Sequence, residues 1–271
     1  MLLQRWLTAI VGIPILIILI NWGSGVLFTI FIAIISMLTL WEYYGIVFSQ
    51  NTDYQFHMIS VLGMILCPIL MYAAYFNLFH LMIALIVADM LICNLICLMQ
   101  YQQNPSMISI AAKQLQGLVY IPLLLSHLIL LRNTPEGDGI RWIFFLLLLV
   151  ASGDTGAYYT GRYLGKHKLS PHVSPGKTIE GLFGGIFCTL LTGLLFAFLW
   201  LPQLNIVKCV VLIIAVSLAG PLGDLFESML KRQGQVKDSS GLLPGHGGFL
   251  DRIDALLFAI PVIFYLKKML I

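Results

Sequence analysis

Ten titratable residues fall within the 35 positions from 220 to 254 of a chain that is otherwise largely apolar: Asp224, Glu227, Lys231, Arg232, Lys237, Asp238, His246, Asp251, Arg252 and Asp254. An ionisable side chain at mid-membrane costs about 2.5–3.5 kcal/mol unless it is paired, hydrated or liganded. Carboxylates beside basic residues are suited to a hard cation with oxygen ligands and to a phosphate-bearing ligand. The segment therefore predicts a chemical site.

The spacing of these residues predicts which of them lie together. Asp224, Glu227, Ser228 and Lys231 share one face of a helix, since they are spaced i, i+3, i+4 and i+7. Asp251 and Asp254 lie one turn apart at the start of the final predicted helix. Carboxylates of two helices converging at one membrane face suit Mg²⁺ if the ligand is a nucleotide. Each of these polar residues, taken singly, also has a purely structural interpretation. Asp251 and Arg252 could form an ion pair, His246 could be a hydrogen-bonding loop residue, and Lys231-Arg232 could be an interfacial anchor.

A second polar segment covers residues 152–185 and combines Gly/Pro turns with the basic side chains of Arg162, Lys166, Lys168 and Lys177. Glycines allow close backbone approach, and arginine and lysine bind phosphate oxygens. The segment, which also contains Asp154 and Thr178, predicts a polyphosphate-binding loop running into a helix N-terminus, which attracts anions. It is not a Walker A motif, because Pro171 replaces the required glycine and no strand precedes it. The structural alternative is a loop that only sets membrane orientation.

These segments belong to a membrane protein. The chain has 271 residues, of which 59% are hydrophobic and 10% charged, whereas soluble domains carry about 25% charged residues. About 20 apolar residues cross the bilayer, and such stretches are found near 5–22, 25–41, 56–75, 77–98, 115–132, 140–159, 181–201, 206–227 and 249–270. The predicted fold is all-α and polytopic, with about nine transmembrane helices.

The charge distribution divides the chain into two parts. Eighteen of the 27 charged residues lie after position 150. We therefore expect residues 1–150 to form a scaffold of five spans and residues 151–271 to form a catalytic transmembrane region. With nine spans, the N-terminus and the two basic segments share a side that carries nine basic residues against five, which predicts a cytoplasmic location for that side. The first span reads as a retained helix rather than a removable signal.

Asp89 is the one acid deep in a span of the first part. It is either a proton or ion site or a residue hydrogen-bonded to a neighbouring helix. The formal net charge of +3 is too small to indicate nucleic-acid binding.

The ordered motif in residues 228–254 resembles the phosphatidate cytidylyltransferases, also called CDP-diacylglycerol synthases. The matching residues are Ser228, Lys231-Arg232, Lys237-Asp238, His246-Gly247-Gly248 and Asp251-Arg252-Ile253-Asp254. The upstream DTGAYYTGR, SPGKT and EGLFGG segments are similar as well, although Gly176 stands where SPKKT is the commoner form. The resemblance covers roughly residues 151–258.

The resemblance implies an enzyme of phospholipid biosynthesis that joins CTP to phosphatidic acid within a bacterial inner membrane. It implies that Asp224 and Asp251 bind Mg²⁺, in a site that could also take K⁺, and that Lys231, Arg232 and Lys237 screen phosphate charge. Substrate contacts are expected from Asp154, Arg162, Lys177, Thr178, Ser228 and His246. Orienting roles are expected from Glu227, Asp238, Arg252 and Asp254. A homodimer is compatible with the sequence, but nothing in it requires one.

Two other functions remain open at the level of sequence. An ion-coupled transporter would use Asp89, Asp154, Asp224 and Asp251 as a cation pathway, but the chain lacks the internal repeats typical of such proteins. A CTP-using polyprenol or phytol kinase would share the nucleotide and the acidic membrane site, and differs in the acceptor.

Overall fold

The computed structural model describes residues 12, 14–49, 58–102, 106–243, 245 and 247–270. Arg5 and His246 lie outside the described residues. The chain forms two compact units, one made of Met1–Asn133 with Gln233–Asp251 and the other of Thr134–Arg232 with Arg252–Ile271. This division by packing differs from the division by charge at residue 150, since residues 233–251 return to the first unit.

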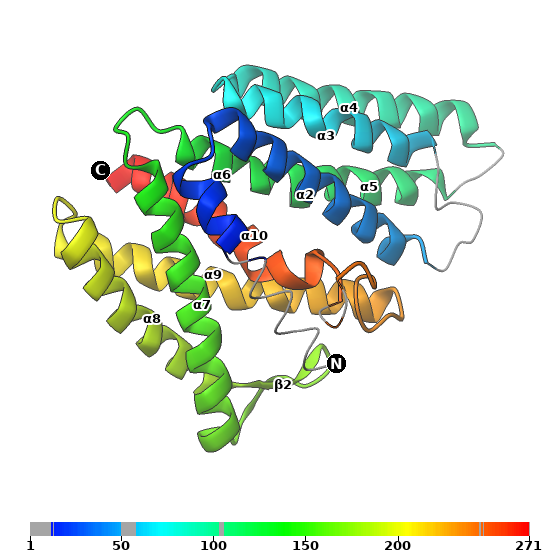
Figure 1. The fold of residues 1–271 in the computed structure, drawn as a ribbon. Coiled ribbons are helices and arrows are strands. Elements are labelled where there is room, and N and C mark those ends of the chain that lie inside the picture. The colour runs from blue at the N-terminus through cyan, green and yellow to red at the C-terminus, as the bar shows by residue number, and fades with distance from the viewer. Residues whose placement is uncertain are drawn as a thin grey trace. The chain divides into compact units, whose positions relative to one another are not determined.

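The first unit is a bundle of apolar helices, which Figure 1 shows in blue to green. It contains α2 (Gly25–Val47), α3 (Met58–Tyr75), α4 (Phe79–Gln100), α5 (Met107–Leu118), η2 (Val119–Leu123) and α6 (Leu124–Arg132). Ser24 begins α2 by accepting a hydrogen bond from the Leu27 amide. Pro122 lies within the π-helical turn η2, as expected because proline cannot donate the helical bond and clashes with the preceding turn.

Asp89 is fully buried in α4, and its Oδ1 accepts a hydrogen bond of 2.9 Å from Gln114 Nε2 of α5. This contact is the one expected of a residue hydrogen-bonded to a neighbouring helix. It compensates part of the cost of burying a polar group in an apolar bundle.

The second unit contains α7 (Gly139–Leu164), the strands β1 (Lys168–Ser170) and β2 (Ser174–Thr178), α8 (Ile179–Trp200), α9 (Ile206–Gln233) and all but the first two residues of α10 (Leu250–Leu270). The strands form a short antiparallel hairpin within a segment that the sequence indicated only as a loop.

At the start of α7, Asp138 lies 2.5 Å from Lys267 Nζ. Burial raises the pKa of Asp138, but hydrogen bonds from Lys267 and Trp142 and the Lys267 charge hold it below its usual range.

Six helical segments among the described residues are long and apolar enough to cross a membrane: Gly25–Val47, Phe79–Gln100, Met107–Arg132, Gly139–Leu164, Ile179–Trp200 and Ile206–Gln233. Ile59–Tyr75 is a shorter apolar helix. The all-α, polytopic membrane fold is therefore confirmed, whereas the count of nine spans stays a prediction.

Helices α7 and α8 cross closely because small residues line their contact. A Cβ added at Gly185 of α8 would lie 2.9 Å from the backbone oxygen of Gly153 in α7, and one at Gly156 of α7 would lie 2.7 Å from Cys188. Small residues allow such close helix contacts in membranes. The crossing holds the polar end of α7 beside the first turn of α8.

We predict that Gly185→Leu lowers the free energy of unfolding by about 1–3 kcal/mol, the usual cost of overpacking. The midpoint of thermal unfolding in detergent would measure it. Gly45→Leu is the matched control, because nothing lies within 4 Å of a Cβ at Gly45. Equal midpoints for the two variants would contradict the close crossing.

Candidate active site at the polar ends of helices α7 to α10

Helix α9 continues past its apolar part to Gln233, so the polar stripe predicted from spacing lies on one helix. Lys231 Nζ lies 2.6 Å from Glu227 Oε2, one turn away. The Ser228 hydroxyl donates to Asp224 Oδ1 at 3.4 Å. Glu227 is only 1% exposed, so the adjacent ammonium compensates a carboxylate that has left water.

Three carboxylates of α9 and α10 gather in the second unit. Single ligand oxygens of Asp224, Glu227 and Asp254 lie within 4.8 Å of one another. Gly223 permits this approach, since a Cβ at that position would collide with the backbone oxygen of Asp254. The sequence had indicated Glu227 and Asp254 as orienting residues, and the structure brings both beside Asp224.

The β1–β2 hairpin brings a lysine to this acidic cluster. Lys177 Nζ lies 2.8 Å from Asp224 Oδ2 and 3.5 Å from the Pro221 carbonyl oxygen, to which it donates. The next residue, Thr178, begins α8, where its hydroxyl accepts a hydrogen bond from the Gly181 amide at 3.1 Å. The helix cap therefore fixes the backbone immediately beside Lys177.

Glu180, in the first turn of α8, holds the start of the hairpin. Its carboxylate accepts hydrogen bonds from the Lys166 amide at 3.0 Å and from the His167 amide at 3.2 Å. The His167 ring nitrogen Nδ1 lies 2.6 Å from the same carboxylate. These contacts tie the chain leaving α7 to the helix that follows the hairpin.

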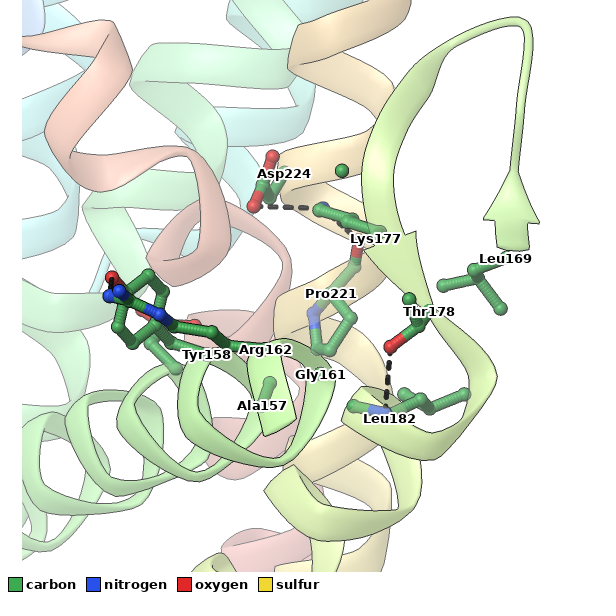
Figure 2. Close-up of a pocket in the computed structure, with 13 residues that line it drawn as sticks. Ala157, Tyr158, Gly161, Arg162, Leu169, Lys177, Thr178, Leu182, Pro221 and Asp224 are labelled. Carbon is green, nitrogen blue, oxygen red and sulfur yellow. Dashed lines mark hydrogen bonds and ion pairs between the residues drawn. The ribbon is translucent and has the colours of Figure 1, made fainter. Parts of the chain in front are cut away.

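A cavity of about 370 Å³ opens beside Lys177 and Asp224. Its polar lining comes from Asp154, Tyr158, Arg162, Lys177, Thr178 and Asp224. Figure 2 shows Lys177 and Asp224 joined on one side and Tyr158 with Arg162 on another. The volume lies in the lower part of the range of small-molecule sites, about 300–1,000 Å³.

The two arginines are held by neighbouring groups. Arg162 Nη1 donates to the Tyr158 hydroxyl at 2.8 Å, and the guanidinium also lies over the ring of Tyr163. Arg232 Nε donates to the carbonyl oxygen of Val173, in the turn of the hairpin, at 3.3 Å. Asp154 is near enough to Asp224 and Lys177 for their charges to interact. Two lysines, Lys177 and Lys231, therefore contact the acidic cluster, and Arg162 lines the same cavity as Lys177.

Other predicted site residues lie in the first unit, on the segment Gln233–Asp251. Asp251 Oδ2 accepts hydrogen bonds from the Ser239 amide at 3.0 Å, the Ser239 hydroxyl at 2.9 Å and the Gly248 amide at 2.8 Å. Lys237 and Asp238 are exposed. Arg252, also exposed, begins the part of α10 that belongs to the second unit.

The structure thus gathers Asp154, Lys177, Asp224, Glu227, Asp254 and Lys231 around one part of the second unit. The pairing of Asp224 with Asp251 at a shared metal stays a prediction, as does a substrate contact by His246. Sequence reasoning missed Glu42 of α2, which is 1% exposed and bonded to the segment that carries Asp251. The sequence feature that could have indicated Glu42 is an acidic residue at the end of an apolar run, in Trp-Glu-Tyr-Tyr.

A sequence profile described as the cytidylyltransferase family matches residues 3–270. The chain therefore belongs to the cytidylyltransferase family. The match extends beyond the resemblance seen in residues 151–258 and takes in the first unit as well.

Curated relatives are similar over part of their length. A phosphatidate cytidylyltransferase of Staphylococcus epidermidis strain RP62A is 48% identical over 128 residues, which are 47% of this chain and 49% of that protein. Proteins of the same name from Bacillus subtilis strain 168 and Staphylococcus aureus strain COL are 40% identical over 148 residues and 44% identical over 128 residues. These matches cover 55% of both chains in the first case, and 47% of this chain and 49% of the relative in the second. The chain spans about half the length of the curated relatives it matches.

We predict that Thr178→Ala destabilises the protein by about 1 kcal/mol, the typical cost of losing an N-cap hydroxyl. It should also speed hydrogen exchange at the Gly181 amide, which the hydroxyl now holds. Thr178→Ser keeps the acceptor and should behave like the unaltered protein. If alanine and serine gave the same unfolding midpoint and exchange, the hydroxyl would not be what fixes the start of α8.

Proposed function

We propose that this membrane protein transfers CMP from CTP to phosphatidic acid, forming CDP-diacylglycerol and releasing pyrophosphate. The observation that carries the proposal is the cluster of Asp224, Glu227 and Asp254 beside a cavity lined by Lys177 and Arg162. Acidic groups for a divalent cation and basic groups for phosphates are the two requirements of nucleotidyl transfer. Membership of the cytidylyltransferase family and the names of the curated relatives support the same reaction.

The donor set suits magnesium. Asp224, Glu227 and Asp254 offer only carboxylate oxygens, which are the ligands that Mg²⁺ prefers, and Mg²⁺ is commonly bound through a few carboxylates plus substrate phosphates. We propose that these three residues hold the ion, with Asp251 as the further candidate implied by the family resemblance. When bound, Mg²⁺ would neutralise triphosphate charge and stabilise the leaving pyrophosphate.

The reaction needs no activated side-chain nucleophile. A phosphate oxygen of phosphatidic acid is already anionic at neutral pH and would attack the α-phosphorus of CTP, while the bond from that phosphorus to the β-phosphate bridging oxygen breaks. The difficulty is repulsion between two anions, because phosphoryl-type transfer depends mainly on positioning and electrostatic stabilisation. Lys177 and Arg162 line the cavity and would bind the triphosphate there.

Lys177 and Lys231 now neutralise the acidic cluster, through Asp224 and Glu227 respectively. If Asp224, Glu227 and Asp254 held a divalent cation, Lys177 would no longer be needed to neutralise Asp224 and would be free to bind a phosphate oxygen of CTP. The ion pair with Asp224 therefore keeps the lysine within reach of the place where it is needed. We further propose that this site faces the cytoplasm of a bacterial inner membrane, where CTP is available and the acyl chains stay in the bilayer.

The test is incubation of the purified protein with CTP, phosphatidic acid and Mg²⁺, followed by identification of the lipid and nucleotide products. We expect CDP-diacylglycerol and pyrophosphate, with activity lost on chelation of the metal. A lipid kinase would instead release CDP and leave no nucleotide on the lipid, and a transporter would release no pyrophosphate.

Carboxylate variants test the ligand assignment. Asp224→Asn and Asp254→Asn should each lower turnover by about 100-fold or more, the scale seen when a preorganised electrostatic contact is removed. Glu136→Gln is the control, since Glu136 is an exposed carboxylate away from the acidic cluster. Comparison with Asp251→Asn shows whether Asp251 shares the role. Near-normal activity of Asp224→Asn would contradict the metal assignment.

A further inference from the structure

A buried carboxylate in the first unit lies outside the chemistry proposed so far. Glu42, near the end of α2, is 1% exposed. Burial of an ionised carboxylate is costly unless hydrogen bonds compensate it. Its partners therefore indicate what the residue does.

Four hydrogen-bond donors to Glu42 come from one distant segment of the chain. Oε1 accepts hydrogen bonds from the Ser240 hydroxyl at 2.6 Å and the Phe249 amide at 2.9 Å. Oε2 accepts from the Leu250 amide at 2.7 Å and the Ser239 hydroxyl at 3.1 Å. The partners are 197 to 208 residues away along the chain, so these bonds fold the segment back onto α2.

Two of these donors are main-chain amides at the start of α10, which begins at Leu250. The first amides of a helix lack partners within the helix, and a negative charge is favourable at that end. Glu42 therefore acts from α2 as an acceptor for amides at the start of α10.

The Ser239 hydroxyl joins Glu42 to Asp251. Its oxygen lies 3.1 Å from Glu42 Oε2 and 2.9 Å from Asp251 Oδ2, so its single proton is shared between the two carboxylates. Two glycines leave room for this arrangement: a Cβ at Gly248 would collide with Ser239 and Glu42, and one at Gly247 would lie 2.5 Å from Asp251 Oδ2. Gly247 also has a φ of +80°, which glycine adopts at little cost. The paired glycines are thus required by close approach to two carboxylates.

We propose that Glu42 is a positioning residue for the reaction: it holds the segment 239–250, and with it the carboxylate of Asp251, in the conformation used for catalysis. This inference rests on the proposed function. It assigns α2 of the N-terminal helices a positioning role, where the sequence indicated only a scaffold.

The decisive variant is Glu42→Gln, which keeps the shape but removes the charge and turns one acceptor into a donor. Loss of an outer partner of a catalytic carboxylate typically costs 10–100-fold in activity or metal affinity. We expect turnover per folded molecule to fall by about that factor, with a smaller change in the KM for CTP. Hydrogen exchange at the Phe249 and Leu250 amides should become faster, and this readout does not depend on activity.

Ser49→Ala is the matched control, because the Ser49 hydroxyl, just after α2, makes a similar long-range bond outside the segment 239–250, donating to the Gly234 carbonyl oxygen at 2.8 Å. It should leave turnover and exchange at Phe249 and Leu250 unchanged. Ser240→Ala removes one bond to Glu42, whereas Ser239→Ala removes the hydroxyl that meets both carboxylates. We therefore expect turnover to be highest in Ser49→Ala, lower in Ser240→Ala and lowest in Ser239→Ala.

The outcomes separate cleanly. A folded Glu42→Gln protein with normal turnover and normal exchange would overturn the proposal, as would a loss of activity that only follows the loss of folded protein. Should Glu42→Gln fail to fold, normal turnover and exchange in both Ser239→Ala and Ser240→Ala would overturn it. If the unaltered protein made no CDP-diacylglycerol, the proposed function would fail. Hydrogen exchange at the Phe249 and Leu250 amides would still test whether Glu42 holds the segment 239–250.

Discussion

Charges held within a largely apolar protein must be compensated locally, and the rest of the structure depends on that constraint. In the second unit, Lys231 neutralises the buried Glu227, and Lys177 neutralises Asp224. The lysine on the hairpin and the carboxylate on α9 therefore hold each other at the cavity. Such a pair adds little net stability when its desolvation is counted, but it places charges of both signs where the proposed metal and polyphosphate would need them.

In the first unit, the carboxylates are compensated by neutral hydrogen-bond donors instead of by lysines. Glu42 is surrounded by two hydroxyls and two main-chain amides of the segment 239–250, and Asp251 accepts three bonds from the same segment. The two carboxylates share the Ser239 hydroxyl, so a change at one is felt at the other. The glycine pair at 247–248 follows from these contacts, since side chains there would separate the groups.

Much of the fold and part of the site could be predicted from the sequence. Apolar stretches of about 20 residues located most of the helices, and the i, i+3, i+7 spacing placed Asp224, Glu227 and Lys231 on one face of α9. The apolar stretches did not locate the helix ends: those near 25–41 and 206–227 belong to helices that continue to Val47 and Gln233, because polar residues do not interrupt helical hydrogen bonding. Glu42 could not be assigned, since its partners are about 200 residues away and no local pattern connects them.

The central claim is that carboxylates of α9 and α10 bind the divalent ion that brings CTP to the site. Binding of Mn²⁺, which prefers the same oxygen ligands as Mg²⁺, can be followed by electron paramagnetic resonance on purified protein with CTP. We expect tight, saturable binding that is abolished by Asp224→Asn and kept by the control Glu136→Gln. Equal Mn²⁺ binding by the Asp224→Asn variant and the unaltered protein would contradict the claim.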